Sequence, residues 1–430
     1  MKIAIAGYGA EGKSNYNYYN NGSNDVVIVD EHEVADAPVD ASVISGQDAF
    51  SRLNGYDLVV RTAGLAPRKI ITDGKIWSST NEFFDKCPAP IIGVTGSKGK
   101  GTTSSLIASI LREAGKTVHL VGNIGIPALD ILGEIKSSDI VVYEMSSFQL
   151  WDLKKSPHIA VVLMIEPDHL DVHADFDEYV AAKANIRKYQ TEQDVCFYHP
   201  TNVFSKQIAM TSDLQNAHAY NDASDKLSVY IDDGNFVVGD RVICSIEVVQ
   251  LPGVHNLENA CAAICAALCY VSDWSAVERG LRAFHGLDHR LKFVREVTGV
   301  KYYDDSIATT PGSAIAAMKA FLQPKVMILG GSSKGADFTE VAKVATQQSV
   351  ISVVVIGAEA NAIEKVFREN TMIKVINLGE KTDMTTIVKE ASAQANSGDV
   401  VILSPACASF GMFKNYSDRG DQFIAAVEQL

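Results

Sequence analysis

A glycine-rich stretch between an apolar run and a helical pattern constrains the fold of this 430-residue chain more than any other feature. Residues 95–103 read Thr-Gly-Ser-Lys-Gly-Lys-Gly-Thr-Thr. The apolar run 91–94 before them predicts a buried strand, and a helical pattern runs from residue 102 to about 113, where Gly115 ends it. A strand, a glycine turn and a helix in this order predict an α/β sheet with a phosphate-binding loop.

The residue types in this turn suit a nucleoside triphosphate. Gly96 and Gly99 let the backbone turn tightly, so that several N–H groups converge on phosphate oxygens. The helix N-terminus adds a positive partial charge, and Lys100 adds a full charge beside the β- and γ-phosphates. A plain strand-to-helix turn is the alternative. The predicted phosphate contacts are Gly96, Ser97, Lys98, Gly99, Lys100, Gly101, Thr102 and Thr103.

Short β-branched runs alternate with helical segments along the chain, which is typical of α/β proteins with mostly parallel sheets. We predict three domains: a Rossmann-like domain at 1–87, a central P-loop-type ATP-binding domain at 88–287 and a Rossmann-like domain at 288–430. Hinges are expected near residues 88 and 288. A strand-rich insertion is expected around 195–250. Expected strands lie at 2–6, 26–29, 116–121, 139–143, 159–165, 300–304, 325–329, 351–356, 374–378 and 400–403, and expected helices at 256–271 and 418–428.

The first domain opens with a second glycine turn. Residues 7–12 read Gly-Tyr-Gly-Ala-Glu-Gly after the strand at 2–6, and Asp30 and Glu31 follow the next strand. This is the dinucleotide-binding fingerprint with its acidic residue. The helix expected behind it is a poor one, because residues 15–22 are mostly Asn and Tyr. A lone fingerprint is weak support for NAD, and a nucleotide diphosphate fits the same turn.

Composition excludes several classes of partner. The net charge of −14 and the pI near 5.2 argue against nucleic acid and against an anionic membrane surface. The chain enters a strand directly at residue 2 and no apolar run approaches about 18 residues, so neither a secretory signal nor a membrane span is expected. We expect a cytoplasmic protein. The stripe of Cys261, Cys265 and Cys269 is interpreted as helix packing rather than as a metal site.

Polar residues follow several of the expected strands, at the sheet edge where ligands bind in open α/β folds. Glu144 follows the strand at 139–143 and suits Mg²⁺, and His169 in the next such loop could bind a metal or steer a phosphate. A zinc site on His169 and His173 is set aside, because further ligands at suitable spacing are missing. Strand-end caps and a plain surface loop are the alternatives. In the third domain the polar segments 304–306, 330–334 and 404–409 predict a cleft for a carboxylate.

Together these motifs resemble the Mur ligases of peptidoglycan synthesis over nearly the whole chain. The segments that carry the resemblance are 122–125 (Gly-Asn-Ile-Gly), 144–150 (Glu-Met-Ser-Ser-Phe-Gln-Leu), 168–171, 251–259, 289–290, 330–338 and 404–410. The strings at 146–150 and 404–409 look specific to the members that add D-glutamate. The resemblance implies that the three domains hold the UDP part of the substrate, ATP and the incoming amino acid.

It also implies a reaction. ATP would phosphorylate the terminal carboxylate of UDP-N-acetylmuramoyl-L-alanine, and the amino group of D-glutamate would displace phosphate from the acyl phosphate. Phosphorylation gives a poor electrophile a leaving group, and lysines and Mg²⁺ offset charge between the anions. The implied enzyme is an ATP-dependent acid–amino-acid ligase that acts as a monomer.

Site residues follow from the resemblance by position. Lys183, an ordinary surface lysine by helix propensity alone, matches the family's carbamylated lysine. The implied catalytic residues are Lys100, Glu144, His169 and Lys183, and those at two Mg²⁺ sites are Thr102, Glu144, Ser146, His169 and Lys183. Further ATP contacts are Asn256, Asn259, Arg290 and Asp305. The UDP-substrate contacts are Gly7, Tyr8, Gly9, Ala10, Asp30, Glu31, Asn123 and Ser147, and the D-glutamate contacts are Thr309, Lys334, Ser409 and Tyr416.

Three positions depart from the family pattern. Gly101 stands where Ser or Thr usually holds Mg²⁺, so that Thr102 or Thr103 has to supply the hydroxyl or the metal relies on other ligands. Ile307 stands where a lysine is usual, and Tyr416 where Phe is usual.

Other functions stay open at this point. The Gly101 departure resembles folylpolyglutamate synthetases, a related ligase group and the first alternative. An NAD-dependent dehydrogenase would leave the phosphate loop and the third domain unexplained. A non-catalytic nucleotide-binding protein is disfavoured because Lys100, Glu144 and His169 are all present.

Overall fold

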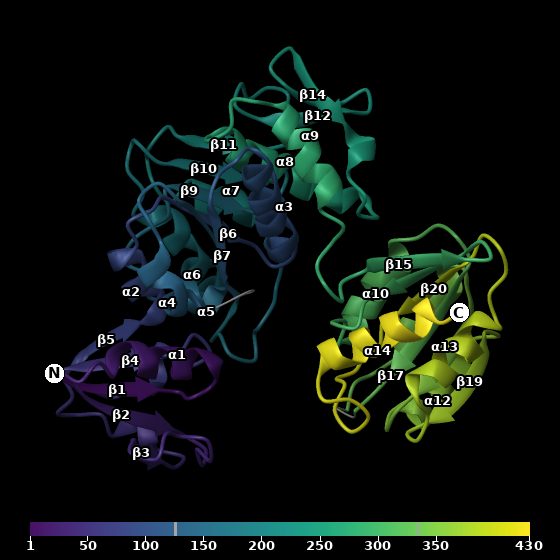
Figure 1. Ribbon diagram of the computed structural model, residues 1–430, viewed down its shortest axis with the longest axis horizontal. Helices are drawn as coiled ribbons and strands as arrows, with labels where there is room; N and C mark the ends of the chain where they lie inside the picture. The colour runs from purple at the N-terminus through teal and green to yellow at the C-terminus, as the bar shows by residue number, and fades with distance from the viewer. Residues whose placement is uncertain (124–126, 333–334) are drawn as a thin grey trace. The chain divides into compact units, whose positions relative to one another are not determined.

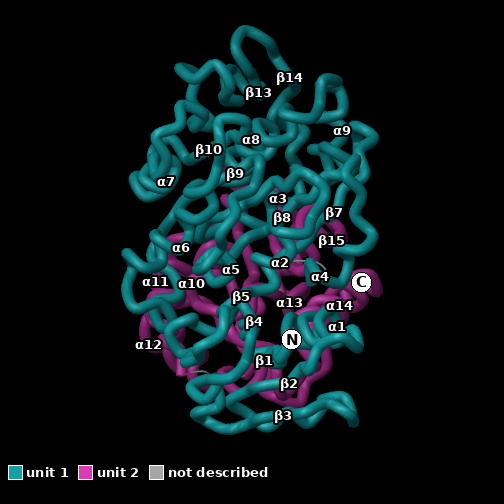
Figure 2. Tube along the Cα trace, turned by 90° about the vertical axis from the view of Figure 1, so that its left-hand side faces the viewer, with its two compact units in different colours: residues 1–249, 255–284 teal, residues 250–254, 285–430 magenta. Residues whose placement is uncertain are grey.

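The computed structural model describes residues 1–123, 127–332 and 335–430. The chain forms two compact units, coloured separately in Figure 2: residues 1–249 with 255–284, and residues 250–254 with 285–430. Each of the three predicted ranges contains its own sheet of parallel or mostly parallel strands (Figure 1). The α/β class is therefore confirmed. The second unit begins close to the expected hinge at 288, whereas residue 88 lies inside the first unit.

The first sheet has the strand order β3-β2-β1-β4-β5 and is parallel throughout. Apolar side chains of β1, β2 and β4 feed core clusters on both faces, as expected for a parallel sheet. Its strands are β1 (Lys2–Ala6), β2 (Asp25–Asp30), β3 (Ser42–Ser45), β4 (Leu58–Arg61) and β5 (Lys75–Ser78). Its helical segments are α1 (Ala10–Tyr19) and the short 3₁₀ turns η1 (Ala49–Ser51) and η2 (Pro67–Lys69). Helix α2 (Ser79–Lys86) follows β5, but its phenylalanines pack in a core cluster of the second sheet.

Helix α1 is better formed than its sequence predicts. It runs for ten residues although Asn and Tyr dominate its second half. Tyr16 and Tyr19 are buried in the same core cluster as Ile3 and Ile5 of β1. Tertiary packing therefore outweighs the weak intrinsic helix propensity of this segment.

The second sheet has the order β11-β10-β9-β6-β8-β7 and is also parallel. Strands β7 and β8 lie on one side of β6, and β9, β10 and β11 lie on the other, so the winding of the sheet reverses beside β6. In open α/β sheets, ligands bind at the carboxyl ends of the strands next to such a reversal. The strands are β6 (Ile91–Thr95), β7 (Val118–Gly122), β8 (Ile140–Glu144), β9 (Ile159–Val162), β10 (Val195–Tyr198) and β11 (Ala217–Ala219).

Helices α3, α8 and α9 share one core cluster of this sheet, and α2, α4, α6 and α7 share the other. Their bounds are α3 (Lys100–Glu113), α4 (Ala128–Ile131), α5 (Ser147–Leu150), α6 (Phe176–Lys188), α7 (Val203–Ala209), α8 (Val254–Leu268) and α9 (Ser275–Ala283), with η3 (Leu132–Glu134) and η4 (Ile246–Val248). The expected strand at 159–165 ends earlier, at Val162.

The expected strand-rich insertion is smaller than 195–250. Strands β10 and β11 pair with the main sheet, so they are not part of an insertion. Only β12 (Val229–Asp232), β13 (Asn235–Val238) and β14 (Arg241–Ser245) form a separate antiparallel sheet. The cysteines are free thiols. Cys261 and Cys265 are packed in the core as the sequence predicts, whereas Cys269 is exposed, because α8 ends one residue before it.

The third sheet has the order β15-β16-β20-β17-β18-β19, with only β15 and β16 antiparallel. Its strands are β15 (Lys292–Val297), β16 (Val300–Asp304), β17 (Lys325–Gly330), β18 (Val350–Ile356), β19 (Lys374–Gly379) and β20 (Val400–Leu403). Its helices are α10 (Pro311–Lys319), α11 (Thr339–Gln347), α12 (Ala360–Asn370), α13 (Met384–Ser392) and α14 (Tyr416–Glu428). Among the described residues, none of the helices is long and apolar enough to cross a membrane.

Candidate active site

The glycine-rich turn after β6 has the geometry of a phosphate loop. Gly99 precedes α3 with φ +84°, and a Cβ atom there would lie 2.5 Å from Asn259 Oδ1. A Cβ atom on Gly96 would lie 2.7 Å from Leu163 Cβ. The first hydrogen bond of the helix runs from the Thr103 N–H to the Gly99 carbonyl, at 2.9 Å. The N–H groups of Gly101 and Thr102 precede this first helical hydrogen bond, and such N–H groups at a helix N-terminus suit an anion.

Two lysines meet at this turn. Lys100 Nζ donates to the carbonyls of Gly96 and Ser97, at 3.0 and 3.1 Å. Lys183 Nζ, from α6, donates to the same Gly96 carbonyl at 2.9 Å and to Thr95 Oγ1 at 3.1 Å. Lys183 is only 1% exposed, so it is not the surface lysine that helix propensity indicates. Burial, with the nearby charge of Lys100, lowers the pKa of Lys183 well below its ordinary value.

Glu144 ends strand β8 beside the turn and is 3% exposed. Its Oε1 accepts a hydrogen bond from Asn123 Nδ2 at 2.8 Å. Its Oε2 is buried and has no hydrogen-bond partner among the described residues. A buried carboxylate oxygen without a partner is unfavourable, and a cation would relieve it. The site therefore fits Mg²⁺ in this respect.

The donor set around Glu144 also bears on the choice of metal. Within residues 1–123, 127–332 and 335–430, no three His, Cys, Asp or Glu side chains gather as a ready metal cluster. Mg²⁺ tolerates this, because it commonly keeps waters and takes ligand phosphates around one or two carboxylates. Thr102 and Thr103 are buried at the start of α3, and the Thr103 hydroxyl has no partner among the described residues.

Ser97 of the glycine-rich turn forms hydrogen bonds with the loop that follows β9. The Ser97 hydroxyl contacts the Tyr179 hydroxyl at 2.8 Å, and it both donates to and accepts from the Glu166 backbone, each at 2.8 Å. Burial raises the pKa of Tyr179 to about 12, so this phenol keeps its proton. His169 has φ +54° and an exposed ring, whose Nε2 lies 3.6 Å from Asp168 Oδ2.

A pocket of about 170 Å³ lies where these elements converge. The residues that line the pocket include predicted site residues and others that the sequence did not indicate. The predicted ones are Lys100, Asn123, Ser146, Ser147, His169 and Lys183, and the others are Phe148, Asp168 and Tyr179. Sequence reasoning missed Tyr179 as a site residue, although it lies one helical turn before Lys183 and therefore on the same face of α6.

Several predicted residues of the first unit also have structural partners. The Ser146 hydroxyl caps α5, where it accepts from the Gln149 N–H at 3.2 Å. The Ser147 hydroxyl lies 2.9 Å from His173 Nε2. Asn259, a predicted ATP contact, lies beside Gly99, and its Nδ2 donates to Oδ1 of the other predicted contact, Asn256, at 3.2 Å. Lys98 is exposed, and its Nζ lies 3.6 Å from Glu166 Oε2.

The N-terminal glycine turn is built differently. Gly7 has φ +94°, and a Cβ atom on it would lie 2.2 Å from Thr62 Oγ1. The Tyr8 N–H donates to Asp30 Oδ2 at 2.8 Å. Asp30 therefore holds the turn together, whereas Glu31 lies 3.3 Å from Lys69 Nζ. Gly9 precedes α1, which begins at Ala10.

The predicted acceptor residues lie in the second unit. Thr309 lines a pocket of about 190 Å³, whereas Ser409 and Tyr416 do not line it. Ser409 is buried, and the exposed Tyr416 begins α14. Lys334, with Ser333 and the motif residues Ile124 and Gly125, lies outside the described residues. The full pocket lining is Thr309, Thr310, Pro311, Ser332, Ala336, Phe338, Glu359, Ala406 and Cys407.

Asp305 and Arg290, predicted to contact ATP, also belong to the second unit. Asp305 is buried, and it accepts from the Ser404 hydroxyl at 2.7 Å and from the Leu291 N–H at 3.1 Å. Burial raises the pKa of Asp305 to about 7. Arg290 is exposed, and Ile307 is exposed at the surface with its N–H bonded to the His289 carbonyl at 3.0 Å.

A parallel sheet with a lysine-lined glycine loop, and with a carboxylate at its edge whose Oε2 has no partner among the described residues, is typical of a nucleotide-binding α/β protein. Two family models match the chain: the Mur ligase middle domain at residues 94–267 and the Mur ligase, glutamate ligase domain at residues 289–407. The chain belongs to the Mur ligase family and is a ligase.

Named relatives extend over most of the chain. The UDP-N-acetylmuramoylalanine--D-glutamate ligase of Acetivibrio thermocellus is 38% identical over 401 residues, which cover 90% of this chain and 85% of that protein. The protein of the same name from Ruminiclostridium cellulolyticum is 34% identical over 459 residues, which cover 100% of this chain and 97% of that protein.

Solved structures share the fold at low sequence identity. UDP-N-acetylmuramate-alanine ligase MurC from Thermotoga maritima has a TM-score of 0.62 at 17% identity and covers 100% of this chain and 99% of that chain. MurF from Thermotoga maritima, solved in complex with ADP, has a TM-score of 0.57 at 16% identity, and the match covers 100% of this chain and 94% of that chain. The three-domain Rossmann-like architecture is therefore that of Mur ligases.

Proposed function

We propose that this chain adds D-glutamate to UDP-N-acetylmuramoyl-L-alanine, with ATP as the energy source, in peptidoglycan precursor synthesis. The observation that carries the proposal is the meeting of Lys100 and Lys183 on the Gly96 carbonyl beside the unpaired Glu144 oxygen. Relatives that bear the name of this activity are 34–38% identical over 85–97% of their own length, which favours it over a folate ligase.

The proposed reaction has two steps. An oxygen of the substrate's terminal carboxylate attacks the γ-phosphorus of ATP, the bond to ADP breaks, and an acyl phosphate forms. The amino group of D-glutamate then attacks the acyl carbon and loses a proton, and phosphate leaves. Both steps bring anions together, and the loop N–H groups and Lys100 are positioned to offset their charge. Lys100 would exchange its two carbonyl contacts for phosphate oxygens.

Two Mg²⁺ ions and a carbamylated Lys183 belong to the proposal. The unprotonated amine of Lys183 would attack CO₂, form an N–C bond and release a proton, which leaves a carboxylate. The lowered pKa of Lys183 supports this, because only the neutral amine is a nucleophile. Glu144, His169, Ser146 and Thr102 would complete the donor set. When bound, Mg²⁺ offsets phosphate charge as a Lewis acid.

The three predicted ranges take separate roles in this proposal. Residues 1–87 would hold the UDP part through Gly7, Tyr8, Gly9, Ala10, Asp30 and Glu31, with Asn123 and Ser147 from the central range. Residues 88–287 would bind ATP, together with Arg290 and Asp305. Residues 288–430 would hold D-glutamate through Thr309, Lys334, Ser409 and Tyr416. We also propose a cytoplasmic monomer, and the free thiols support a reducing compartment.

Phosphate release tests the proposal. Purified protein is given ATP, Mg²⁺ and UDP-N-acetylmuramoyl-L-alanine with D-glutamate, L-glutamate or other D-amino acids in turn. Release with D-glutamate alone is the expected result. Release with a different amino acid alone would keep the ligase chemistry but overturn the acceptor, and would direct attention to Ile307. Turnover only with a folate substrate would replace the proposal with the alternative ligase.

A further inference from the structure

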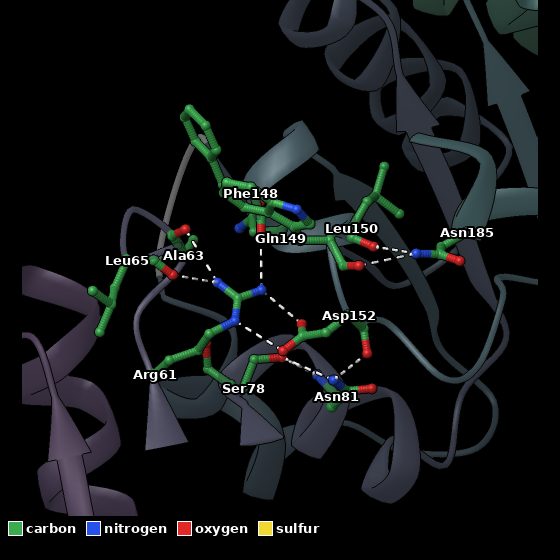
Figure 3. Close-up of polar contacts among 12 residues, drawn as sticks. Arg61, Ala63, Leu65, Ser78, Asn81, Phe148, Gln149, Leu150, Asp152 and Asn185 are labelled. Atoms are coloured by element: carbon green, nitrogen blue, oxygen red, sulfur yellow. Dashed lines mark hydrogen bonds and ion pairs between the residues drawn. The ribbon is translucent and has the colours of Figure 1, made fainter. Parts of the chain in front are cut away.

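Arg61, the last residue of β4, is a buried arginine that no predicted role uses. Its side chain has no exposed surface, and that of its partner Asp152 is 18% exposed. Nε donates to Asp152 Oδ2 at 2.8 Å, and Nη2 donates to Asp152 Oδ1 at 2.6 Å. Figure 3 shows this paired contact at the centre of a wider polar network. A two-point arginine–carboxylate contact fixes orientation as well as distance.

The other guanidinium contacts go to backbone carbonyls from two separate segments. Nη1 donates to the carbonyls of Thr62, Ala63 and Leu65, at 3.3, 3.2 and 3.2 Å. Nη2 donates to the Phe148 carbonyl at 2.9 Å. All three nitrogens of the group are therefore occupied, and the contacts with Phe148 and Asp152 join residues 87 and 91 positions apart in the chain.

One side of this network leads to the N-terminal glycine turn. Thr62 follows Arg61 directly, and its hydroxyl oxygen lies 2.2 Å from the place where a Cβ on Gly7 would be. The Thr62 N–H and hydroxyl both donate to the Ala6 carbonyl, at 2.9 and 3.3 Å. Arg61 is thus attached to the turn proposed to hold the UDP part of the substrate.

The other side leads to the wall of the ATP pocket. We call residues 146–152 the wall segment, because Ser146, Ser147 and Phe148 line the pocket. Asn185, on the helix that carries Lys183, donates to the carbonyls of Leu150 and Trp151 at 2.9 and 3.2 Å. The wall segment is therefore held from the first sheet by Arg61 and from α6 by Asn185, as Figure 3 shows.

We propose that Arg61 is a positioning residue that sets the wall segment relative to the N-terminal glycine turn and so couples the nucleotide-substrate site to the ATP pocket. The inference rests on the proposed function for the identity of the two ligands. A buried ion pair is a weak source of stability compared with apolar packing, so a role in fixing one geometry accounts better for its presence. Small displacements of groups around a reacting centre have large effects on rate.

Conservative variants at this pair test the proposal. In Arg61→Lys the two-point contact is lost, and in Asp152→Asn the charge is lost. Both are expected to lower kcat/KM for the nucleotide substrate by about tenfold to hundredfold. The coupling is measured directly by titrating ADP with and without UDP-N-acetylmuramoyl-L-alanine. In the unmodified protein, the substrate is expected to change the affinity for ADP. In the variants, the ADP affinities measured with and without the substrate are expected to be nearly equal.

Arg187→Lys is the matched control. Arg187 is also completely buried, and its guanidinium bonds the carbonyls of Ala209 and Leu214 and the side chain of Gln190. None of these residues lines the pocket. The control is expected to lower the melting temperature as much as Arg61→Lys while keeping the ligand coupling. Equal kinetic losses in both variants at equal melting temperatures would show a purely structural role and overturn the proposal.

A second variant keeps the test decisive if the single variants fold poorly. Arg61→Met combined with Asp152→Leu removes both charges and keeps the volume, which often preserves folding. A folded double variant without coupling supports the proposal, and one with full coupling overturns it. Failure of the unmodified protein to release phosphate would instead overturn the proposed function, so the two failures are distinguishable.

Discussion

Glycine turns follow the first strands of the first two sheets, β1 and β6, and they carry opposite charges. Their backbones differ in detail, because Gly99 directly precedes α3, whereas Gly7 stands two residues before Gly9, which precedes α1. Both have a glycine at positive φ between a buried strand and a helix, Gly7 at +94° and Gly99 at +84°. At the first turn the carboxylate of Asp30 accepts from the Tyr8 N–H, at 2.8 Å. At the second turn Lys100 and Lys183 bond the carbonyls of the loop.

The difference shows that a glycine pattern sets the path of the backbone, whereas surrounding side chains set the ligand. The second turn, with two lysines on its carbonyls, suits the negative charges of the proposed ATP phosphates. The first already contains a carboxylate, and a second one, Glu11, accepts from the Ala63 N–H at 2.7 Å. We therefore expect the first turn to orient its nucleotide by shape and hydrogen bonds, and to contribute little charge neutralisation.

The strongest test of the contrast is Lys100→Met. Loss of a cation on the transferring phosphate is expected to lower kcat by about 10²- to 10³-fold. Lys116→Met is the matched control, because Lys116 is exposed and lies just beyond the C-terminal end of α3, at the far end of the helix from the loop. The control is expected to change kcat by less than about threefold. Phosphate release measures both, and equal losses would contradict the assignment of Lys100 to the phosphates.

Lys183→Ala is expected to be nearly inactive, with a loss of about 10- to 100-fold or more, because the proposed carbamate is removed. Added acetate or formate is expected to restore part of the activity, since a short carboxylate can occupy the vacated space. A ¹³C signal from ¹³CO₂ on the unmodified protein, lost in the variant, gives a readout independent of turnover. A folded variant without rescue, and no ¹³C signal, would contradict the carbamate.

A pair of alanine substitutions tests whether the two turns bind different ligands. Gly99→Ala places a methyl group at positive φ against Asn259, and Gly7→Ala does the same against Thr62. Left-handed backbone with a side chain costs about 1–2 kcal/mol, so each variant is expected to raise one KM about tenfold. Gly99→Ala should affect ATP, and Gly7→Ala the UDP substrate. Steady-state kinetics with each substrate varied in turn measures both KM values. A higher KM for the UDP substrate in Gly99→Ala, or for ATP in Gly7→Ala, would contradict the assignment of the two turns.

Asp30→Asn should have the smallest effect. The amide can still accept from the Tyr8 N–H, but the negative charge is gone. Weaker repulsion of a diphosphate is expected to lower the KM for the UDP substrate about two- to fivefold and to leave the KM for ATP unchanged. A higher KM for the UDP substrate, with an unchanged melting temperature, would mean that hydrogen bonds from the substrate to the Asp30 carboxylate outweigh this repulsion.

Much of the fold and part of the site could be predicted from local patterns. β-Branched runs located most of the strands, and the expected strands at 2–6, 300–304 and 400–403 have the observed bounds. The phosphate loop was predictable because its glycines, its lysine and the flanking strand and helix are all within about twenty residues. Strand pairing was not predictable in this way, and β10 and β11 therefore joined the main sheet unexpectedly.

The sequence by itself determined the α/β class, the strand–glycine turn–helix unit at 91–113 and the family, because each depends on residues close together in the chain or on motifs in fixed order. Tertiary structure alone decided three features. It buried Lys183 and lowered its pKa, it formed α1 from residues with weak helix propensity, and it paired Arg61 with Asp152. Each depends on contacts between distant segments, and burial and desolvation at such contacts are properties of the packed molecule rather than of any local pattern.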